Sequence, residues 1–126
     1  MGESRFRRAL HRFAASDSER ESEELIERAH REGAEPVSRC QDRSRVCVSG
    51  TVRSVRLDTR GGSPVLEVEL FDGTGVLTLV FLGRRGVAGI DAGRSLTAHG
   101  RITMPEGRRT MFNPSYELLP ADAGAR

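Results

Sequence analysis

Arginine is the residue type in this sequence that is best suited to holding another molecule. All 20 of its Lys and Arg residues are arginines, and the planar guanidinium fork binds phosphate oxygens two at a time. The arginines near the ends of predicted strands are Arg53, Arg56, Arg60, Arg84, Arg85, Arg101, Arg108 and Arg109. Arginines gathered around one surface would form an electrostatic funnel for phosphate groups. The alternative is that they are scattered over a solvated surface.

Aromatic rings could add stacking interactions to such a surface. Phe71 is in phase with Glu67 and Glu69, which we expect to face solvent, so its ring is expected at the surface as well. Tyr116 could pack beneath the last strand or offer its ring to a ligand. Stacking of a base on an aromatic ring contributes about 1–3 kcal/mol. Arginines and aromatics together therefore predict a nucleic-acid site, although an exposed ring also suits a protein interface.

The residue types that carry catalysis or bind metals are not grouped in the sequence. His11, His30 and His99 fall in different predicted elements, and Cys40 and Cys47 form no CxxC pair. The sequence contains no serine in an elbow motif and no P-loop. We therefore expect no metal, no cofactor and no enzymatic activity. A disulfide between the two cysteines is sterically conceivable, but nothing in the sequence favours it.

A predicted β-hairpin lies at the centre of the elements that position these residues. Apolar side chains alternate through residues 64–71, which is the period of a half-buried strand. The expected core side chains are Leu66, Val68 and Leu70. The sequence Asp72-Gly73-Thr74-Gly75 tolerates positive φ and reverses the chain into a strand at residues 76–82.

A long strand precedes this hairpin and is expected to bend. From Arg45, Val46 and Val48 share one face with Gly50, and the apolar phase then shifts to Val55. A phase shift after a glycine indicates a bulge or a sharp coil, which lets one strand take part in two sheets. Such a strand can close a small barrel.

The remaining strands complete a five-stranded pattern. A short helical link is expected at residues 84–90, a fourth strand around 96–102, and a fifth strand at 108–119 that Asn113-Pro114 interrupts. Three strands, a short link and two further strands match the mainly β, five-stranded Greek-key OB-fold barrel. The barrel is predicted at residues 37–119, after a helical extension at 1–36 and before a disordered tail at 120–126.

The extension contains two predicted helices of opposite charge. Residues 1–14 form a basic amphipathic helix that could dock on the domain or on a second copy, contact phosphates, or lie on a membrane surface. Residues 15–33 form an acidic helix with a thin apolar stripe. We expect this helix to be mostly solvated, although it could also cover a basic face.

Composition limits the class of the protein without identifying its partner. A chain of 126 residues can form one domain with a short appendage, and a net charge of +2 does not by itself indicate nucleic acid. The sequence contains no apolar run as long as a membrane span and no signal-peptide pattern. We therefore expect a cytoplasmic protein with no membrane span.

The stretch from Val46 to Leu118 also resembles a known family. Its motifs resemble the OB-fold nucleic-acid-binding domains of RecG-type helicase wedges and bacterial replicative polymerases, and small stand-alone bacterial OB-fold proteins. The residues that carry the resemblance are Gly50-Thr51-Val52, Leu70-Phe71-Asp72-Gly73-Thr74-Gly75, Leu77-Thr78-Leu79-Val80-Phe81, Ala92-Gly93, Gly100 and Asn113-Pro114-Ser115-Tyr116-Glu117. No helicase motor motif accompanies them.

The resemblance implies a role for the third strand. It places Leu77, Leu79 and Phe81 inside the barrel, and it places Leu82 where wedge domains usually carry an aromatic that stacks on an unpaired base. A leucine offers no π-face, so this departure argues against stacking of the junction type.

From these observations we predict a non-enzymatic protein that binds nucleic acid, DNA rather than RNA, in single-stranded or branched form. A role in DNA repair or recombination follows from the resemblance alone. The predicted contact residues are Arg53, Arg56, Phe71, Leu82, Arg84, Arg85, Arg101, Arg108, Arg109 and Tyr116. The alternative is a protein-interaction or self-association module that uses an apolar patch of Phe71, Val80 and Leu82.

Overall fold

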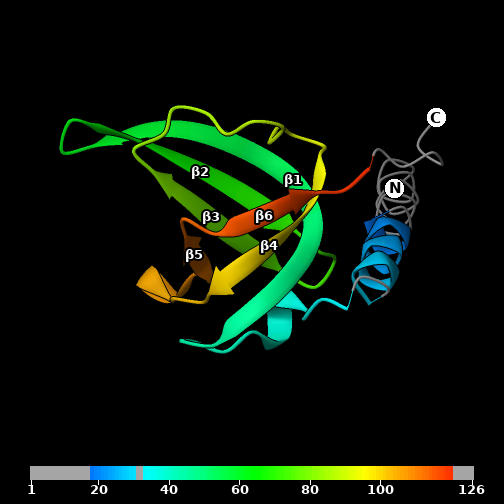
Figure 1. The fold of residues 1–126 in the computed structure, drawn as a ribbon. Coiled ribbons are helices and arrows are strands. Elements are labelled where there is room, and N and C mark those ends of the chain that lie inside the picture. The colour runs from blue at the N-terminus through cyan, green and yellow to red at the C-terminus, as the bar shows by residue number, and fades with distance from the viewer. Residues whose placement is uncertain (1–17, 31–32, 121–126) are drawn as a thin grey trace, which may run out of the picture.

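The computed structural model describes residues 18–30 and 33–120 of the chain. The predicted basic helix at 1–14 and nearly all of the predicted tail lie outside these residues. The described part consists of a coiled β-sheet with a helix at one end (Figure 1).

The strands form one sheet that wraps around the core. They are β1 (Arg45–Arg60), β2 (Ser63–Phe71), β3 (Val76–Leu82), β4 (Ser95–Arg101), β5 (Thr110–Phe112) and β6 (Ser115–Leu118). Their order in the sheet is β5-β3-β2-β1-β4-β6. The predicted hairpin of β2 and β3 is confirmed, with Leu66 opposite Phe81 and Leu70 opposite Leu77.

The prediction of a closed five-stranded barrel needs correction. The described residues form six strands in an open order, in which no strand ladder closes the sheet and an isolated bridge between Thr103 and Thr110 joins the chain after β4 to β5. The predicted fifth strand is divided into β5, which pairs with β3, and β6, which pairs with β4. The division falls at Asn113, whose φ of 49° is left-handed, and at Pro114, which has no N–H to donate. The two edge strands are therefore consecutive pieces of one chain segment.

Strand β1 bends as its glycine predicts and belongs to both halves of the sheet. Residues Arg45–Thr51 pair with β4, and Thr51–Arg60 pair with β2, with a register shift between Val52 and Ser54. A Cβ atom at Gly50 would lie 2.5 Å from the carbonyl oxygen of Phe71. Only glycine therefore allows the backbones to approach so closely at the bend.

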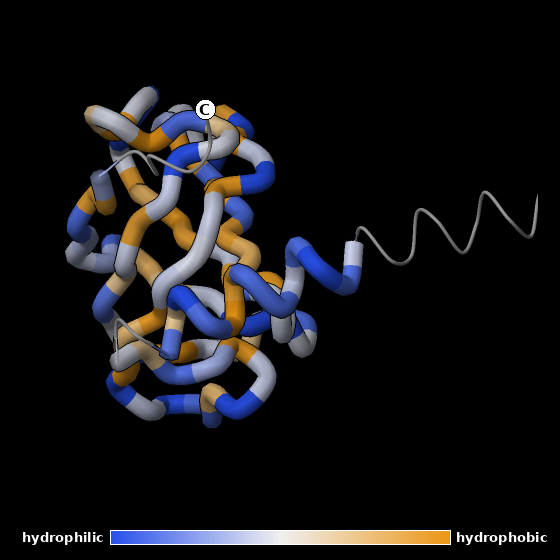
Figure 2. The backbone as a smooth tube through the Cα atoms, turned by 90° about the vertical axis from the view of Figure 1, so that its right-hand side faces the viewer, coloured by the Kyte–Doolittle hydropathy of each residue, from blue (hydrophilic) through white to orange (hydrophobic). Residues whose placement is uncertain are grey.

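The core fills the inside of the coiled sheet. The predicted inward side chains of β2 and β3 are buried, including Val68, Leu70 and Phe81, and Figure 2 shows apolar segments along the strands. Each fully buried leucine or phenylalanine contributes about 1.5–3 kcal/mol. The link between β3 and β4 was predicted to be a short helix, and this prediction is wrong, because the link consists of turns and bends. It places Val87 and Ile90 in the core.

The helix at residues 18–30 contacts the barrel over a small area. Ala29 is buried and the Arg28 guanidinium donates to Ser95 Oγ at 3.0 Å, while most other side chains are exposed. This arrangement confirms the expected solvated helix, which Figure 2 shows as mainly hydrophilic. It lies at the end of the barrel opposite the β1–β2 turn (Figure 1). Within the described residues, no helix has the length and apolar character needed to cross a bilayer.

The turn between β2 and β3 is organised by Asp72, as predicted. Its buried carboxylate accepts hydrogen bonds from the backbone N–H groups of Thr74 and Gly75, at 2.9 and 3.1 Å. The other oxygen accepts from Val37 N at 2.8 Å, at the start of the 3₁₀ turn η1 (Val37–Arg39). One side chain therefore joins the hairpin to the segment that precedes the barrel.

Candidate nucleic-acid interface

The outward side chains of four strands form rows across one face of the sheet. The strand register aligns Arg56 of β1 with Glu67 of β2, Glu67 with Val80 of β3, and Val80 with Phe112 of β5. A neighbouring row runs through Ser54, Glu69, Thr78 and Thr110. Side chains in register on one face contact their neighbours. Residues distant in the sequence are thereby brought together on one surface.

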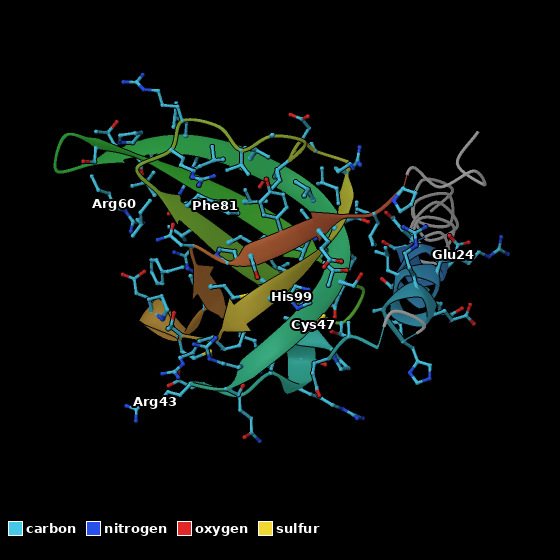
Figure 3. The ribbon with its side chains drawn as sticks, viewed as in Figure 1. Glu24, Arg43, Cys47, Arg60, Phe81 and His99 are labelled. Atoms are coloured by element: carbon cyan, nitrogen blue, oxygen red, sulfur yellow. The ribbon has the colours of Figure 1, made fainter. Side chains whose placement is uncertain are left out.

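A groove of about 290 Å³ lies on this face, between the β1–β2 hairpin and the connection from β4 to β5. That connection contains the turn η2 (Pro105–Gly107). The residues that line the groove are Arg60, Glu67, Thr78, Val80, Pro105, Glu106, Arg108, Thr110 and Phe112. The hairpin and η2 both project to the left in Figure 1, and Arg60 is labelled there in Figure 3. Phe112 is 43% exposed, so its ring is available to a ligand.

The groove is lined by two arginines, Arg60 and Arg108, and two glutamates, Glu67 and Glu106, and Glu67 is paired with arginines. Arg56 and Arg60 each donate from one Nη2 to a different oxygen of Glu67, at 2.6 and 2.8 Å. The two arginine side chains are 67% and 53% exposed, whereas that of Glu67 is only 9% exposed. Two positive charges surround one buried negative charge, so the cluster is net positive. Each guanidinium carries five N–H donors and most of them remain for a ligand.

Comparison with known proteins identifies the family. A family model described as an OB-fold nucleic acid binding domain matches residues 46–119, which is more than half of the chain. The chain belongs to this family. In OB-fold domains the face of strands 2 and 3 and the flanking loops are where oligonucleotides bind, and the groove occupies that position here.

A solved structure similar to this OB-fold domain is that of RecG bound to a three-way DNA junction. The TM-score is 0.57 at 16% sequence identity, and the match covers 71% of this chain but only 13% of the RecG chain. At this identity the likeness concerns the fold. No curated protein matches this chain.

A further arginine and a further aromatic residue lie at the other end of the same face of the OB-fold domain. The guanidinium carbon of Arg53 lies 3.7 Å from the centroid of the Phe71 ring. Phe71 is half-buried and pairs with Val76 in β3, two rows away from the row of Glu67. The contact is a cation–π interaction, which holds Arg53 over the face. Of the predicted residues, the structure thus brings Arg53 and Phe71 together.

The arginines of the β4–β5 region have different surroundings. Arg108 is exposed and lines the groove, and Arg101 is exposed at the end of β4. Arg109 donates to the carbonyl oxygens of Cys40 and Ser38 at 2.9 and 3.2 Å, so it joins this connection to η1. Burial raises the pKa of the Cys40 thiol, and the charge of Arg109 partly opposes that effect. The two cysteines are free thiols.

Other predicted residues meet at the gap between β3 and β6. A shallow cavity of about 640 Å³ is lined there by Leu82, Arg84 and Tyr116, together with Phe81 and the Asn113–Ser115 segment. The Tyr116 ring packs edge-on against Phe81, with centroids 6.0 Å apart, and its hydroxyl donates to Ala88 O at 3.2 Å. These contacts give Tyr116 a structural role. Arg85 is exposed beside Arg84 in the same connection.

The predicted apolar patch is not continuous. Val80 is only 2% exposed, because it lies in the floor of the groove beside η2. Phe71 pairs with Val76 at one end of the β2–β3 pair, whereas Leu82 pairs with Val65 at the other end. The three residues therefore do not form the single docking surface that the sequence suggested.

Of the groove residues, only Arg108 belongs to the predicted contact set. Arg60 is among the arginines that the sequence places near strand ends, and Phe112 is a contact candidate that only the structure provides. The outward position of Phe112 follows from the alternation of side chains along β5. Met111 is fully buried, so its neighbour Phe112 must point to the opposite face of the sheet. Residues 18–30 and 33–120 contain no cluster of His, Cys, Asp and Glu that could hold a metal ion.

Proposed function

We propose that this OB-fold domain binds single-stranded nucleic acid, or the single-stranded part of a branched structure, without catalysing a reaction. The observation that carries the proposal is the groove, where exposed arginines and the exposed ring of Phe112 line one surface. Arginine supplies phosphate contacts and the ring supplies a stacking platform. A base in a duplex has both faces covered by its neighbours, so an unpaired base suits Phe112 better.

The proposed contacts extend from the groove in both directions. Arg60 and Arg108 in the groove, and Arg56 beside it on Glu67, contact phosphates, and Phe112 stacks on a base. Arg53 and Phe71 continue the path at one end of the face. At the other end the path reaches the exposed residues Leu82, Arg84 and Arg85, with Arg101 and Arg109 on the flank.

DNA is the proposed ligand rather than RNA. The support is the likeness of fold to RecG, whose structure was solved on a three-way DNA junction. On the same ground we propose a role in DNA repair or recombination.

The test is fluorescence anisotropy of a labelled single-stranded oligonucleotide at about 50 and about 200 mM salt, with duplex DNA and RNA as competitors. Each phosphate contact on a single strand should contribute about −0.7 to the slope of log K against log salt. Arg56→Gln with Arg60→Gln should reduce the magnitude of that slope by about 0.7 when the two arginines share one phosphate, and by up to about 1.4 when they contact two.

The matched control removes the same charge away from the groove. Arg20 is exposed on the helix at 18–30, and Arg43 is exposed before β1. Arg20→Gln with Arg43→Gln should leave the slope nearly unchanged. An equal decrease of the slope in both double variants would mean that binding depends on net charge and not on the groove. No binding at either salt would refute the proposed function.

A further inference from the structure

The carboxylate of Glu67 is an unusual group to find in the proposed path of a polyanion. It is nearly buried, and each of its oxygens accepts one hydrogen bond, one from Arg56 and one from Arg60. The arginines reach it from different positions of β1, since Arg56 lies opposite Glu67 and Arg60 lies opposite Ser63. The side chain of Arg60 therefore leans back along the hairpin toward Glu67.

This arrangement restricts two long side chains before any ligand arrives. A free arginine side chain loses rotamer entropy when a ligand fixes it, and this loss opposes binding. Glu67 holds each guanidinium by one nitrogen and leaves the remaining N–H groups at the exposed side of the cluster. Fixing donors in advance reduces the cost of binding.

The opposing effect is repulsion between Glu67 and a phosphate. Two arginines lie within hydrogen-bonding distance of the carboxylate and compensate its charge, whereas a phosphate would meet the exposed guanidinium groups first. A phosphate at the exposed guanidinium groups would lie at the solvent boundary, where the effective dielectric constant is higher than in the interior and weakens its repulsion from the carboxylate. We therefore expect the restriction of the arginines to outweigh the repulsion.

We propose that Glu67 is a positioning residue, which holds Arg56 and Arg60 as a preformed pair of forks for one phosphate of the bound strand. This inference rests on the proposed function. It leads to an unusual expectation, because removal of a negative charge from a nucleic-acid-binding face should weaken binding.

The test compares two isosteric substitutions on the same strand and face. Glu69 is exposed one row away, and it has no ion pair within residues 18–30 and 33–120. We expect Glu67→Gln to weaken binding of a labelled single-stranded DNA oligonucleotide by roughly 5- to 10-fold. Glu69→Gln should leave binding equal or slightly stronger. Equal or tighter binding by Glu67→Gln would overturn the inference.

Two further comparisons separate the position of the carboxylate from its charge and from damage to the fold. Glu67→Asp keeps the charge but withdraws the carboxylate by one methylene, so it should also weaken binding; unchanged binding would contradict a positioning role. In a background of Arg56→Gln and Arg60→Gln, Glu67→Gln should cause no further weakening, whereas structural damage would persist there. A wild-type protein that binds no oligonucleotide would refute the proposed function itself. Weakening that persists without the arginines would refute only the role of Glu67.

Discussion

Single residues on the outer face show how one strand can serve both the core and a ligand. In β5, Met111 is fully buried while Phe112, its neighbour, is 43% exposed at the groove. An exposed phenylalanine has a cost, since its ring stays in water in the free protein. The stacking role that we propose would offset this cost when a strand binds.

Phe112→Ala should therefore weaken binding of single-stranded DNA by about 1–3 kcal/mol, which corresponds to roughly 5- to 150-fold. Anisotropy measures this change. The control is Tyr116→Phe, which removes the hydroxyl that donates to Ala88 but keeps the ring packed on Phe81. That variant should lose about 1 kcal/mol of stability and keep its affinity. A Phe112→Ala variant with unchanged affinity would exclude the ring from the interface.

At the scale of elements, the coil of β1 decides whether the sheet can wrap around its core. The strand changes partner from β4 to β2 at Thr51, directly after the glycine that approaches Phe71. Its two partners pair with successive parts of the strand, whereas β2 pairs with β1 and β3 along the same residues.

Gly50→Ala is expected to destabilise the domain by about 3 kcal/mol or more, because the added methyl would press on backbone and not on a movable side chain. Urea unfolding gives the free energy. Gly86→Ala is the control, since a Cβ atom there meets nothing within 4 Å. Similar losses in both variants would show that the close approach at Gly50 can relax.

The sequence was sufficient to predict the elements governed by local rules. The alternation of Leu66, Val68 and Leu70 predicted the hairpin, and Gly50 with the phase shift after it predicted the bend of β1. The burial of Val80 could not be predicted, because it depends on η2, which comes 25 or more positions later in the chain. The pairing of Glu67 with two arginines likewise depends on the register of β1 against β2. Long-range contacts of this kind leave no local pattern.

At the scale of the whole molecule, one buried carboxylate connects the barrel to the segment that precedes it. Asp72 stabilises the β2–β3 turn and also accepts a hydrogen bond from Val37 N at the start of η1. Arg109 donates to the carbonyl oxygens of Ser38 in η1 and Cys40 directly after it. The β2–β3 turn, η1 and the β4–β5 connection are thereby held together.

Asp72→Ala should reduce the free energy of unfolding by about 3 kcal/mol, because it leaves the buried N–H of Val37 and the part-buried N–H groups of Thr74 and Gly75 without an acceptor. Asp91→Ala serves as the comparison, since that side chain is exposed, and it should change stability by less than about 0.5 kcal/mol. Unfolding in urea distinguishes the two. A change below 1 kcal/mol in Asp72→Ala would show that water replaces the lost carboxylate.

The helix at 18–30 and the chain after β6 both contact Ser95, and this has a practical consequence. Its hydroxyl accepts from Arg28 of the helix, and its carbonyl accepts from Leu119 N, just after β6. The described chain therefore enters and leaves the barrel side by side, at the end away from the β1–β2 hairpin (Figure 1). A fluorescent protein or a surface tether attached beyond either end would leave the groove open. This OB-fold domain is thus suited to immobilisation and to insertion into a larger polypeptide.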